Sequence, residues 1–153
     1  MVNADAQLLD RFGLSVEVRT PDGIEQRVEI MRRCAAKDAD SEAFAAEWQA
    51  EDGKVLRRIA RGQKKLSGLA VPDAVMTDMA ELCRAVGADG LRGELTLMRA
   101  ARALAAIGGA EAVGREHLVA VAPMALRHRL RRDVLDETGS TVRIERAIGE
   151  LFG

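Results

Sequence analysis

Aromatic residues are almost absent from this sequence, which contains no tyrosine, one tryptophan and three phenylalanines among 153 residues. Alanine, leucine and arginine abound instead, and these residues favour helices. Apolar residues make up 48% of the chain and charged residues 31%, a balance typical of a globular rather than a disordered protein. We therefore expect a mainly helical fold with a core of reasonable size.

Cysteine and histidine are also scarce. Cys34 and Cys83 are too far apart in sequence to indicate a disulfide framework or a metal cluster, and each lies beside apolar helical positions. His117 and His128 are eleven residues apart, with no cysteine or carboxylate at metal-ligand spacing. The sequence thus predicts reduced thiols and no metal site.

Long apolar runs and a basic excess are missing as well. No run approaches the roughly 18 residues that span a bilayer, and no signal peptide opens the sequence. The formal net charge is −1, whereas a general nucleic-acid binder has a strong basic excess. We interpret the basic run 127–132 as a helix end whose cations complement the helix dipole, or as a contact with an acidic neighbouring protomer. We expect a cytoplasmic protein without a membrane span or a nucleic-acid partner.

Helical periodicity dominates what is present. Alternation of Leu14, Val16 and Val18 predicts one strand over 14–19, which must pair with a strand absent from this chain or lie loose. Apolar spacing then predicts helices over 24–35, 41–49, 53–66, 75–86, 92–108 and 115–131, the last bent or interrupted by Pro123, and a weaker helix over 144–151. The predicted fold is a helical bundle with one residual strand from a missing α/β domain.

Arginine opens the helix in GLRGELTLMRAARALAA, where Arg92 stands between Gly90 and Gly93. The free N–H groups and the dipole of a helix start favour an anion. A guanidinium grips phosphate oxygens with a fixed fork of donors, and we expect the two glycines to clear room for a ligand or another chain. The alternative is a surface arginine paired with Asp89 or Glu94.

Arg11 is the second arginine of interest, because it stands directly before the predicted strand in LLDRFG. Its simpler interpretation is a local pair with Asp5 or Asp10. The spacing leaves both interpretations open. The sequence has no G-x-x-x-x-G-K-[ST] phosphate loop and no nucleophile with a recognisable base beside it, so it shows no complete active site.

Five segments occur in an order that resembles one known family: LLDRFGLSVEV, DGLRGELTLMRAARALAA, VGREHL, APMALRHRLRRD and GSTVRIERAI. They resemble the family of magnesium chelatase I subunits, the AAA+ ATPase component of the enzyme that begins (bacterio)chlorophyll synthesis. The resemblance runs from about residue 8 to the end. LLDRFGL is shared more widely among AAA+ proteins, and its combination with GLRGELTL and HRLRRD is more specific.

The resemblance implies a division of the chain and a role for both arginines. Residues 1–22 would be the C-terminal edge of the AAA+ core, 23–67 linker helices, 68–135 the helical lid bundle and 136–153 a tail helix. Arg11 matches the arginine finger, which reaches the γ-phosphate bound by the adjacent protomer and stabilises charge during hydrolysis. Arg92 matches the sensor 2 arginine of the lid, which responds to that phosphate and couples it to lid movement.

The same resemblance implies partners and cofactors. The I subunit forms a homo-oligomeric ring, works with the chelatase D subunit, and drives the porphyrin-binding H subunit, which inserts Mg²⁺ into protoporphyrin IX in the bacterial cytoplasm. The intact I subunit uses ATP and Mg²⁺. The Walker A, Walker B and sensor 1 elements of the family are missing here, so the chain resembles only its C-terminal part. By itself it should hold no cofactor and hydrolyse no ATP, and residues 1–6 suggest an artificial or truncated start.

Two alternatives remain open from the sequence. One is the AAA+ region of the chelatase D subunit, which would normally continue into an acidic, proline-rich linker and a metal-binding integrin-like domain; the stop after Gly153 favours the I subunit. The other is a stand-alone helical docking module without ATPase activity, which would use the same arginine surfaces to bind a partner ring.

Overall fold

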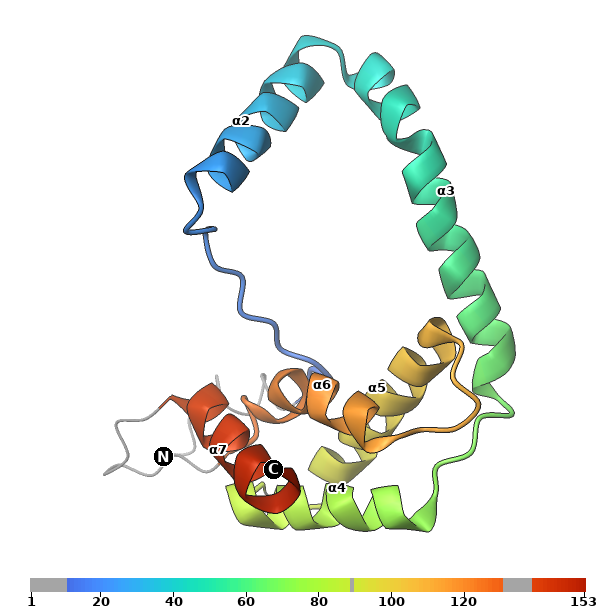
Figure 1. Ribbon diagram of the computed structural model, residues 1–153, viewed down its shortest axis with the longest axis vertical. Helices are drawn as coiled ribbons and strands as arrows, with labels where there is room; N and C mark the ends of the chain where they lie inside the picture. The colour runs from blue at the N-terminus through green and yellow to red at the C-terminus, as the bar shows by residue number, and fades with distance from the viewer. Residues whose placement is uncertain (1–10, 89, 131–138) are drawn as a thin grey trace. The chain divides into compact units, whose positions relative to one another are not determined.

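Helices make up all the regular structure of the described residues, which in this computed structural model are 11–88, 90–130 and 139–153. This part of the chain holds no sheet, only two isolated bridges that pair Ala70 with Ala112 and Ala88 with Leu130. The mainly α fold class is thereby confirmed. Figure 1 shows the six helices: α2 (Ile24–Ala39), α3 (Ser41–Leu66), α4 (Asp73–Val86), α5 (Arg92–Gly108), α6 (Arg115–Leu126) and α7 (Ser140–Phe152).

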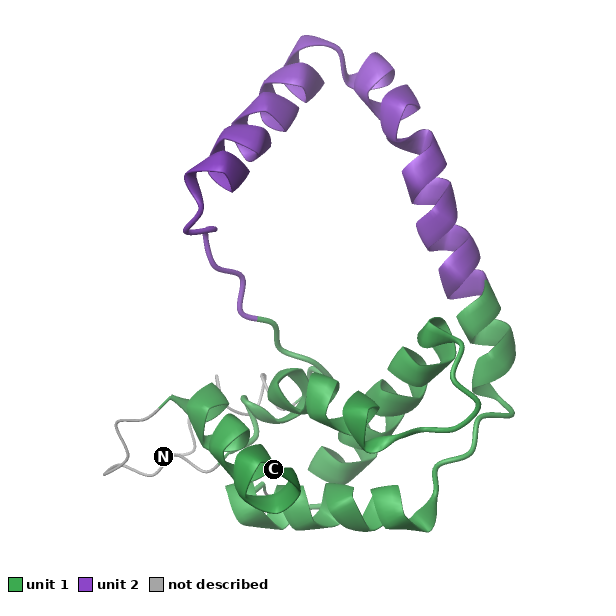
Figure 2. Cartoon of the chain, viewed as in Figure 1, with its two compact units in different colours: residues 1–16, 61–153 green, residues 17–60 purple. Residues whose placement is uncertain are grey.

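The chain divides into two compact units (Figure 2). The first comprises residues 1–16 and 61–153, and the second comprises residues 17–60. The sequence-based segments 1–22, 23–67, 68–135 and 136–153 stay predictions; residues 1–10 and the boundary near residue 135 lie outside the described residues.

Helices α4, α5, α6 and α7 pack into a bundle in the first unit, with α5 and α6 in the most extensive contact. Each helix buries one apolar stripe, as its 3.6-residue period dictates. The largest fully buried side chains are aliphatic or sulfur-bearing: Met79, Leu82, Cys83, Leu97, Val113, Leu118, Leu126 and Ile144. α7 supplies Ile144 and Ala147 to this core, so the predicted tail helix packs on its own bundle rather than standing apart from it.

Arg115 joins three helices at the base of the bundle. Its guanidinium binds both carboxylate oxygens of Asp78 on α4, with Nε and Nη2 at 2.8 and 3.0 Å. It also lies over the ring of Phe152 on α7, 4.9 Å from the centroid. The hydrogen bond to Asp78 and its charge raise the pKa of Arg115. This single side chain therefore fixes the spacing of α4, α6 and α7.

The last turn of α3 also belongs to the first unit and packs on the end of α5. A Cβ at the buried Gly62 would meet the backbone of Ile107 at 3.1 Å, so a larger residue would force the two helices apart by a few tenths of an ångström. Arg102 of α5 donates from Nη2 to the carbonyl of Leu66 at 2.9 Å, which satisfies one of the open carbonyls at the end of α3.

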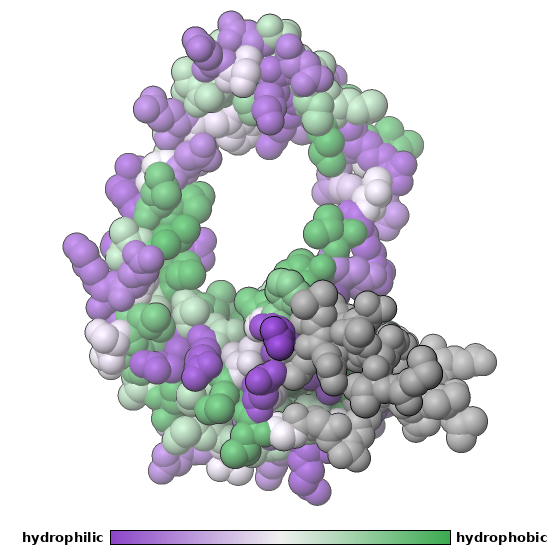
Figure 3. All heavy atoms as spheres, turned by 180° about the vertical axis from the view of Figure 1, so that it is seen from behind, coloured by the Kyte–Doolittle hydropathy of each residue, from purple (hydrophilic) through white to green (hydrophobic). Residues whose placement is uncertain are grey.

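The second unit holds α2 and most of α3, joined at Asp40. The Asp40 carboxylate accepts from the amides of Glu42 and Ala43 at 3.1 and 2.9 Å and so caps the start of α3. The guanidinium of Arg33 on α2 lies 4.4 Å from the ring centroid of Trp48 on α3. No residue of α2 is buried, and exposed apolar side chains lie among charged ones along both helices (Figure 3).

The strand predicted over 14–19 is wrong, because residues 14–20 have no regular secondary structure. The amide of Ser15 bonds the carbonyl of Met124 at the end of α6 instead of a neighbouring strand. A segment with alternating side chains forms a β-ladder only when its backbone pairs with a second strand, and the described residues contain no such strand. Leu14, Val16 and Val18 are 49%, 63% and 90% exposed.

Two helix boundaries also differ from the sequence-based prediction. α3 runs unbroken through Gly53, where two helices were predicted; one interior glycine costs only about 1 kcal/mol, and the exposed Lys54–Glu51 pair spans the same turn. α6 continues through Pro123 and ends at Leu126, not near residue 131. The predicted helix ends at residues 86 and 108 are confirmed, and the glycine that follows each, Gly87 or Gly109, adopts positive φ (68° and 81°).

We expect Leu97→Ala to destabilise the bundle by about 2–5 kcal/mol, because the side chain is fully buried and its loss leaves a cavity. Leu95→Ala on the same helix is the matched control: this side chain is 45% exposed and its loss should cost about 1 kcal/mol or less. Urea unfolding followed by far-UV circular dichroism measures both. Equal losses would contradict the assigned orientation of α5.

Candidate functional site

Arg92 is the first residue of α5, and its side chain is exposed. The preceding Leu91 provides no side-chain cap, so the N-cap residue of this 17-residue helix does not supply the side-chain acceptor that commonly satisfies the first N–H groups. The positive end of the helix dipole and a guanidinium therefore occupy the same place. Such a place suits a phosphate-bearing ligand.

The glycines on either side of Arg92 have different roles. Gly90 has φ +66°, and a side chain there would meet nothing within 4 Å; the backbone conformation requires glycine. Gly93 is buried, and an added Cβ would lie 3.5 Å from Leu126 Cδ2 and 3.7 Å from Cys83 Sγ. The expectation that Gly93 clears room for a ligand is therefore wrong, because the space beside this glycine faces side chains of α4 and α6.

The surroundings of Cys83 show how closely α5 approaches α4. Its thiol is fully buried, and burial raises its pKa to about 12, with a further contribution from the negative charge of Glu94. Glu94 belongs to the first turn of α5, and its Oε2 is a buried atom without a hydrogen-bond partner among the described residues. The thiol therefore stays protonated at neutral pH, and the first turn of α5 rests directly on α4.

Arg11 is exposed and precedes a backbone segment that is fixed to α6. The carbonyl of Phe12 accepts from His128 Nε2 at 2.9 Å and from Arg129 Nη2 at 2.7 Å. Ser15 donates its amide to the carbonyl of Met124 at 2.8 Å. We call residues 11–15 the Arg11 segment.

Every carbonyl in the last turn of α6 has a partner. Met124 O accepts from Ser15, while Pro123 O accepts from the amide and Nε of Arg127, both at 3.2 Å. Arg129 serves two more, because its Nε donates to Ala125 O at 3.2 Å and its amide to Leu126 O at 2.8 Å. Of the two interpretations of the basic run, the helix-end interpretation thus holds for the arginines at 127 and 129. Arg131 and Arg132 lie outside the described residues.

The structure brings both arginine-bearing segments to this end of α6. The start of α5 lies beside it, since a Cβ at Gly93 would be 3.5 Å from Leu126 Cδ2, and the Arg11 segment reaches it through Ser15 and Phe12. The candidate acidic partners Asp5, Asp10 and Asp89 lie outside the described residues. Sequence reasoning missed His128 and Arg129 as anchors of the Arg11 segment.

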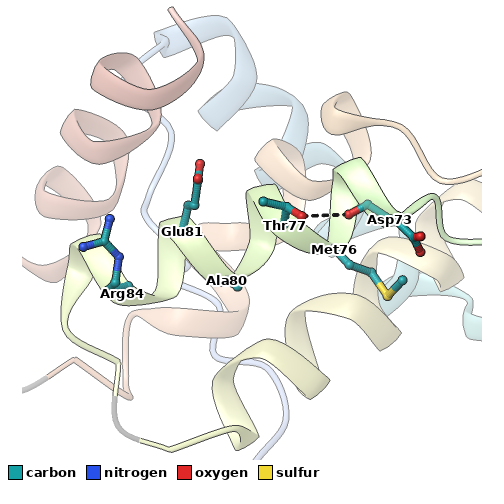
Figure 4. A pocket seen from close by; sticks show the side chains of 6 residues that line it. All are labelled: Asp73, Met76, Thr77, Ala80, Glu81 and Arg84. Carbon is teal, nitrogen blue, oxygen red and sulfur yellow. Dashed lines mark hydrogen bonds between the residues drawn. The ribbon is translucent and has the colours of Figure 1, made fainter.

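The other surface features are weaker candidates for a functional site. A groove of about 500 Å³ runs along α4, and Figure 4 shows that all six of its lining side chains come from this one helix. The hydroxyl of Thr77 bonds the carbonyl of Asp73 at 3.0 Å within the helix, so the groove offers no converging polar groups. Among the described residues no cluster of histidine, cysteine, aspartate and glutamate could hold a metal. None of the described helices is long and apolar enough to cross a membrane.

Known proteins resemble the chain over the region that holds this site. Residues 76–148, which include α5, α6 and Arg92, match the family described as the AAA lid domain.

Two curated relatives match almost the whole chain. The magnesium-chelatase 38 kDa subunit of Cereibacter sphaeroides is 59% identical over 146 residues, which are 95% of this chain and 44% of the relative. The magnesium-chelatase 38 kDa subunit of Rhodobacter capsulatus is 56% identical over 144 residues, which are 94% of this chain and 41% of the relative. The chain therefore spans less than half the length of these relatives.

A solved structure is similar in sequence as well. A cryo-electron-microscopy structure of the complex between subunits BchI and BchD of magnesium chelatase contains a chain that is 50% identical to this one. The match covers 92% of this chain and 41% of that chain, with a TM-score of 0.39.

We expect Gly90→Ala to destabilise the fold by about 1–2 kcal/mol, because it forces a Cβ into the left-handed region. Gly108→Ala in α5 is the control: its backbone φ is not positive and the space around it is open. That substitution should be neutral or stabilise by up to about 1 kcal/mol. Chemical unfolding of both variants measures the difference, and destabilisation of similar size at both positions would contradict the prediction.

Proposed function

From the chain's membership of the magnesium-chelatase 38 kDa subunit family, over the region that it spans, we propose that it is the C-terminal part of the ATPase motor of a magnesium chelatase. The motor couples ATP hydrolysis to the insertion of Mg²⁺ into protoporphyrin IX in (bacterio)chlorophyll synthesis. The observation that carries this proposal is the exposed Arg92 at the first position of α5, within the AAA lid match. A helix start that bears a guanidinium suits the γ-phosphate of a nucleotide.

Arg11 is the catalytic arginine in this proposal and acts in trans on the nucleotide of the neighbouring protomer. Its exposure leaves the guanidinium accessible to another chain, and its backbone neighbour Phe12 is fixed by two hydrogen bonds. A guanidinium that reaches the γ-phosphate stabilises the charge that develops during transfer, and such a group contributes on the order of 10³-fold or more to the rate.

Arg92 has the sensor role. It responds to the γ-phosphate, and because α5 packs on both α4 and α6, a movement of Arg92 moves the bundle as a body rather than one side chain. The bundle is therefore the lid that couples nucleotide state to movement.

The partners follow from the same proposal. The intact protein would bind ATP and Mg²⁺, assemble into a ring with copies of itself, and work in the cytoplasm with the chelatase D subunit and the porphyrin-binding H subunit. The residues described here would supply the arginine finger and sensor 2, while the phosphate-binding loop would come from elsewhere in the intact protein.

The test of Arg11 uses a chimera in which this chain replaces the matching part of the Cereibacter sphaeroides 38 kDa protein. Arg11→Ala should slow ATP hydrolysis on the order of 10³-fold, and replacement of the phosphate-loop lysine should abolish it. A mixture of the two variants should recover activity, because an intact Arg11 then faces an intact phosphate loop at some interfaces. If the parent chimera is active and the mixture is as inactive as each variant alone, Arg11 does not act in trans. A parent chimera without ATPase activity would favour a docking role.

The test of Arg92 compares Arg92→Ala with Arg99→Ala, an exposed arginine on the same helix. In the chimera, Arg92→Ala should weaken ATP binding by about tenfold or more through the loss of a charged hydrogen bond to phosphate, with the melting temperature unchanged. Arg99→Ala should alter neither quantity. Equal effects at both positions, or a loss of helicity in Arg92→Ala, would argue for a structural role.

A further inference from the structure

Two side chains after α6 hold the peptide group next to Arg11. His128 Nε2 and Arg129 Nη2 both bond the carbonyl of Phe12, at 2.9 and 2.7 Å. A carbonyl oxygen only accepts, so His128 carries its proton on Nε2. Two donors on one oxygen restrain the direction of this peptide group as well as its distance from α6.

Arg129 spans from α6 to the Arg11 segment. Its side chain is half-buried, with Nε on the carbonyl of Ala125 and Nη2 on the carbonyl of Phe12. The guanidinium is planar, so these two donors have a fixed relation to each other. The last turn of α6 and the backbone beside Arg11 are thus held in one arrangement, to which the bond from Ser15 to Met124 adds a third point.

The same turn of α6 touches the start of α5. Leu126 Cδ2 lies 3.5 Å from the position that a Cβ would take at Gly93, the residue that follows Arg92, and the amide of Arg129 donates to the carbonyl of Leu126. Close-packed side chains do not yield independently. A displacement of the first turn of α5 therefore presses on Leu126 and, through it, on the residue that holds Phe12.

We propose that Arg129, together with His128, is a positioning residue for Arg11, and that the end of α6 links the position of Arg92 to that of Arg11. This inference rests on the role proposed above for Arg11. Arg129 bonds the carbonyls of Ala125 and Phe12, so in this proposal it acts by setting where the Arg11 guanidinium can reach. The sensor of one protomer is thereby connected to the arginine that the same protomer offers to its neighbour's nucleoside triphosphate.

The first experiment measures the link itself on the present chain. Amide hydrogen exchange, followed by NMR, should show that Arg129→Ala accelerates exchange of the Ser15 amide by about tenfold or more, because the Arg11 segment loosens. Arg127→Ala is the matched control, since it removes an equal charge and a bond to Pro123 at the same helix end. Ser15 exchange that is unchanged in Arg129→Ala, or equally accelerated in Arg127→Ala, would overturn the proposal.

The second experiment measures ATP hydrolysis in the chimera under single-turnover conditions, so that slow rates remain measurable. Arg129→Ala should lower the rate constant of hydrolysis by about 10- to 100-fold through misplacement of Arg11, with the apparent ATP affinity and melting temperature unchanged. Arg129→Lys, which offers one donor group in place of the fork, should recover part of the rate. The double variant Arg11→Ala/Arg129→Ala should be no slower than Arg11→Ala alone, whereas a further loss would show that Arg129 acts independently of Arg11.

His128→Ala is a second variant that tests the same proposal if Arg129→Ala lowers the melting temperature. It removes one of the two bonds to Phe12 and leaves the Arg129 fork on α6, so it should slow hydrolysis less than Arg129→Ala without loss of stability. A normal rate in Arg129→Ala beside an inactive Arg11→Ala would overturn this inference and leave the proposed function standing. A fully active Arg11→Ala would overturn the proposed function, while the exchange result would still decide whether the link exists.

Discussion

The carbonyl groups in the last turn of α6 impose the constraint on which the site depends. A helix end leaves its final carbonyls without intrahelical partners, and buried carbonyls must find others. Here the partners are Arg127, Arg129 and the amide of Ser15. The open carbonyls of this helix end thus bind the Arg11 segment to the bundle, although that segment is more than a hundred residues away in sequence.

The start of α5 depends on the same helix end in another way. The position that a Cβ would take at Gly93 lies 3.5 Å from Leu126 Cδ2 and 3.7 Å from Sγ of Cys83, which is a neutral, buried thiol. The exposed Arg92 therefore stands on a tightly packed support. A side chain that projects from such a support can be placed accurately without being buried itself.

Sequence patterns predicted those features of the fold that depend on interactions within one short segment. The periodicity of 92–108 and the following glycines predicted α5 and its stop, because helical spacing and a left-handed glycine are encoded within a few residues. The strand at 14–19 failed because its alternation needs a partner, which no single segment reveals. The anchoring of Phe12 by His128 was equally inaccessible, since it joins distant segments through a backbone carbonyl. The two arginines were found from their helix context and motifs, and their roles stay predictions.

The scarcity of aromatic residues has an optical consequence. The single tryptophan, Trp48, lies in the second unit beside Phe44 and Arg33, and the core of the bundle is aliphatic and sulfur-bearing. The sequence contains no tyrosine, so fluorescence excited in the tryptophan band comes from α3 alone. Emission and far-UV ellipticity therefore monitor different parts of the same chain: the first follows residues 17–60, and the second also follows the bundle that carries Arg92. A single unlabelled sample can reveal whether the two units unfold together.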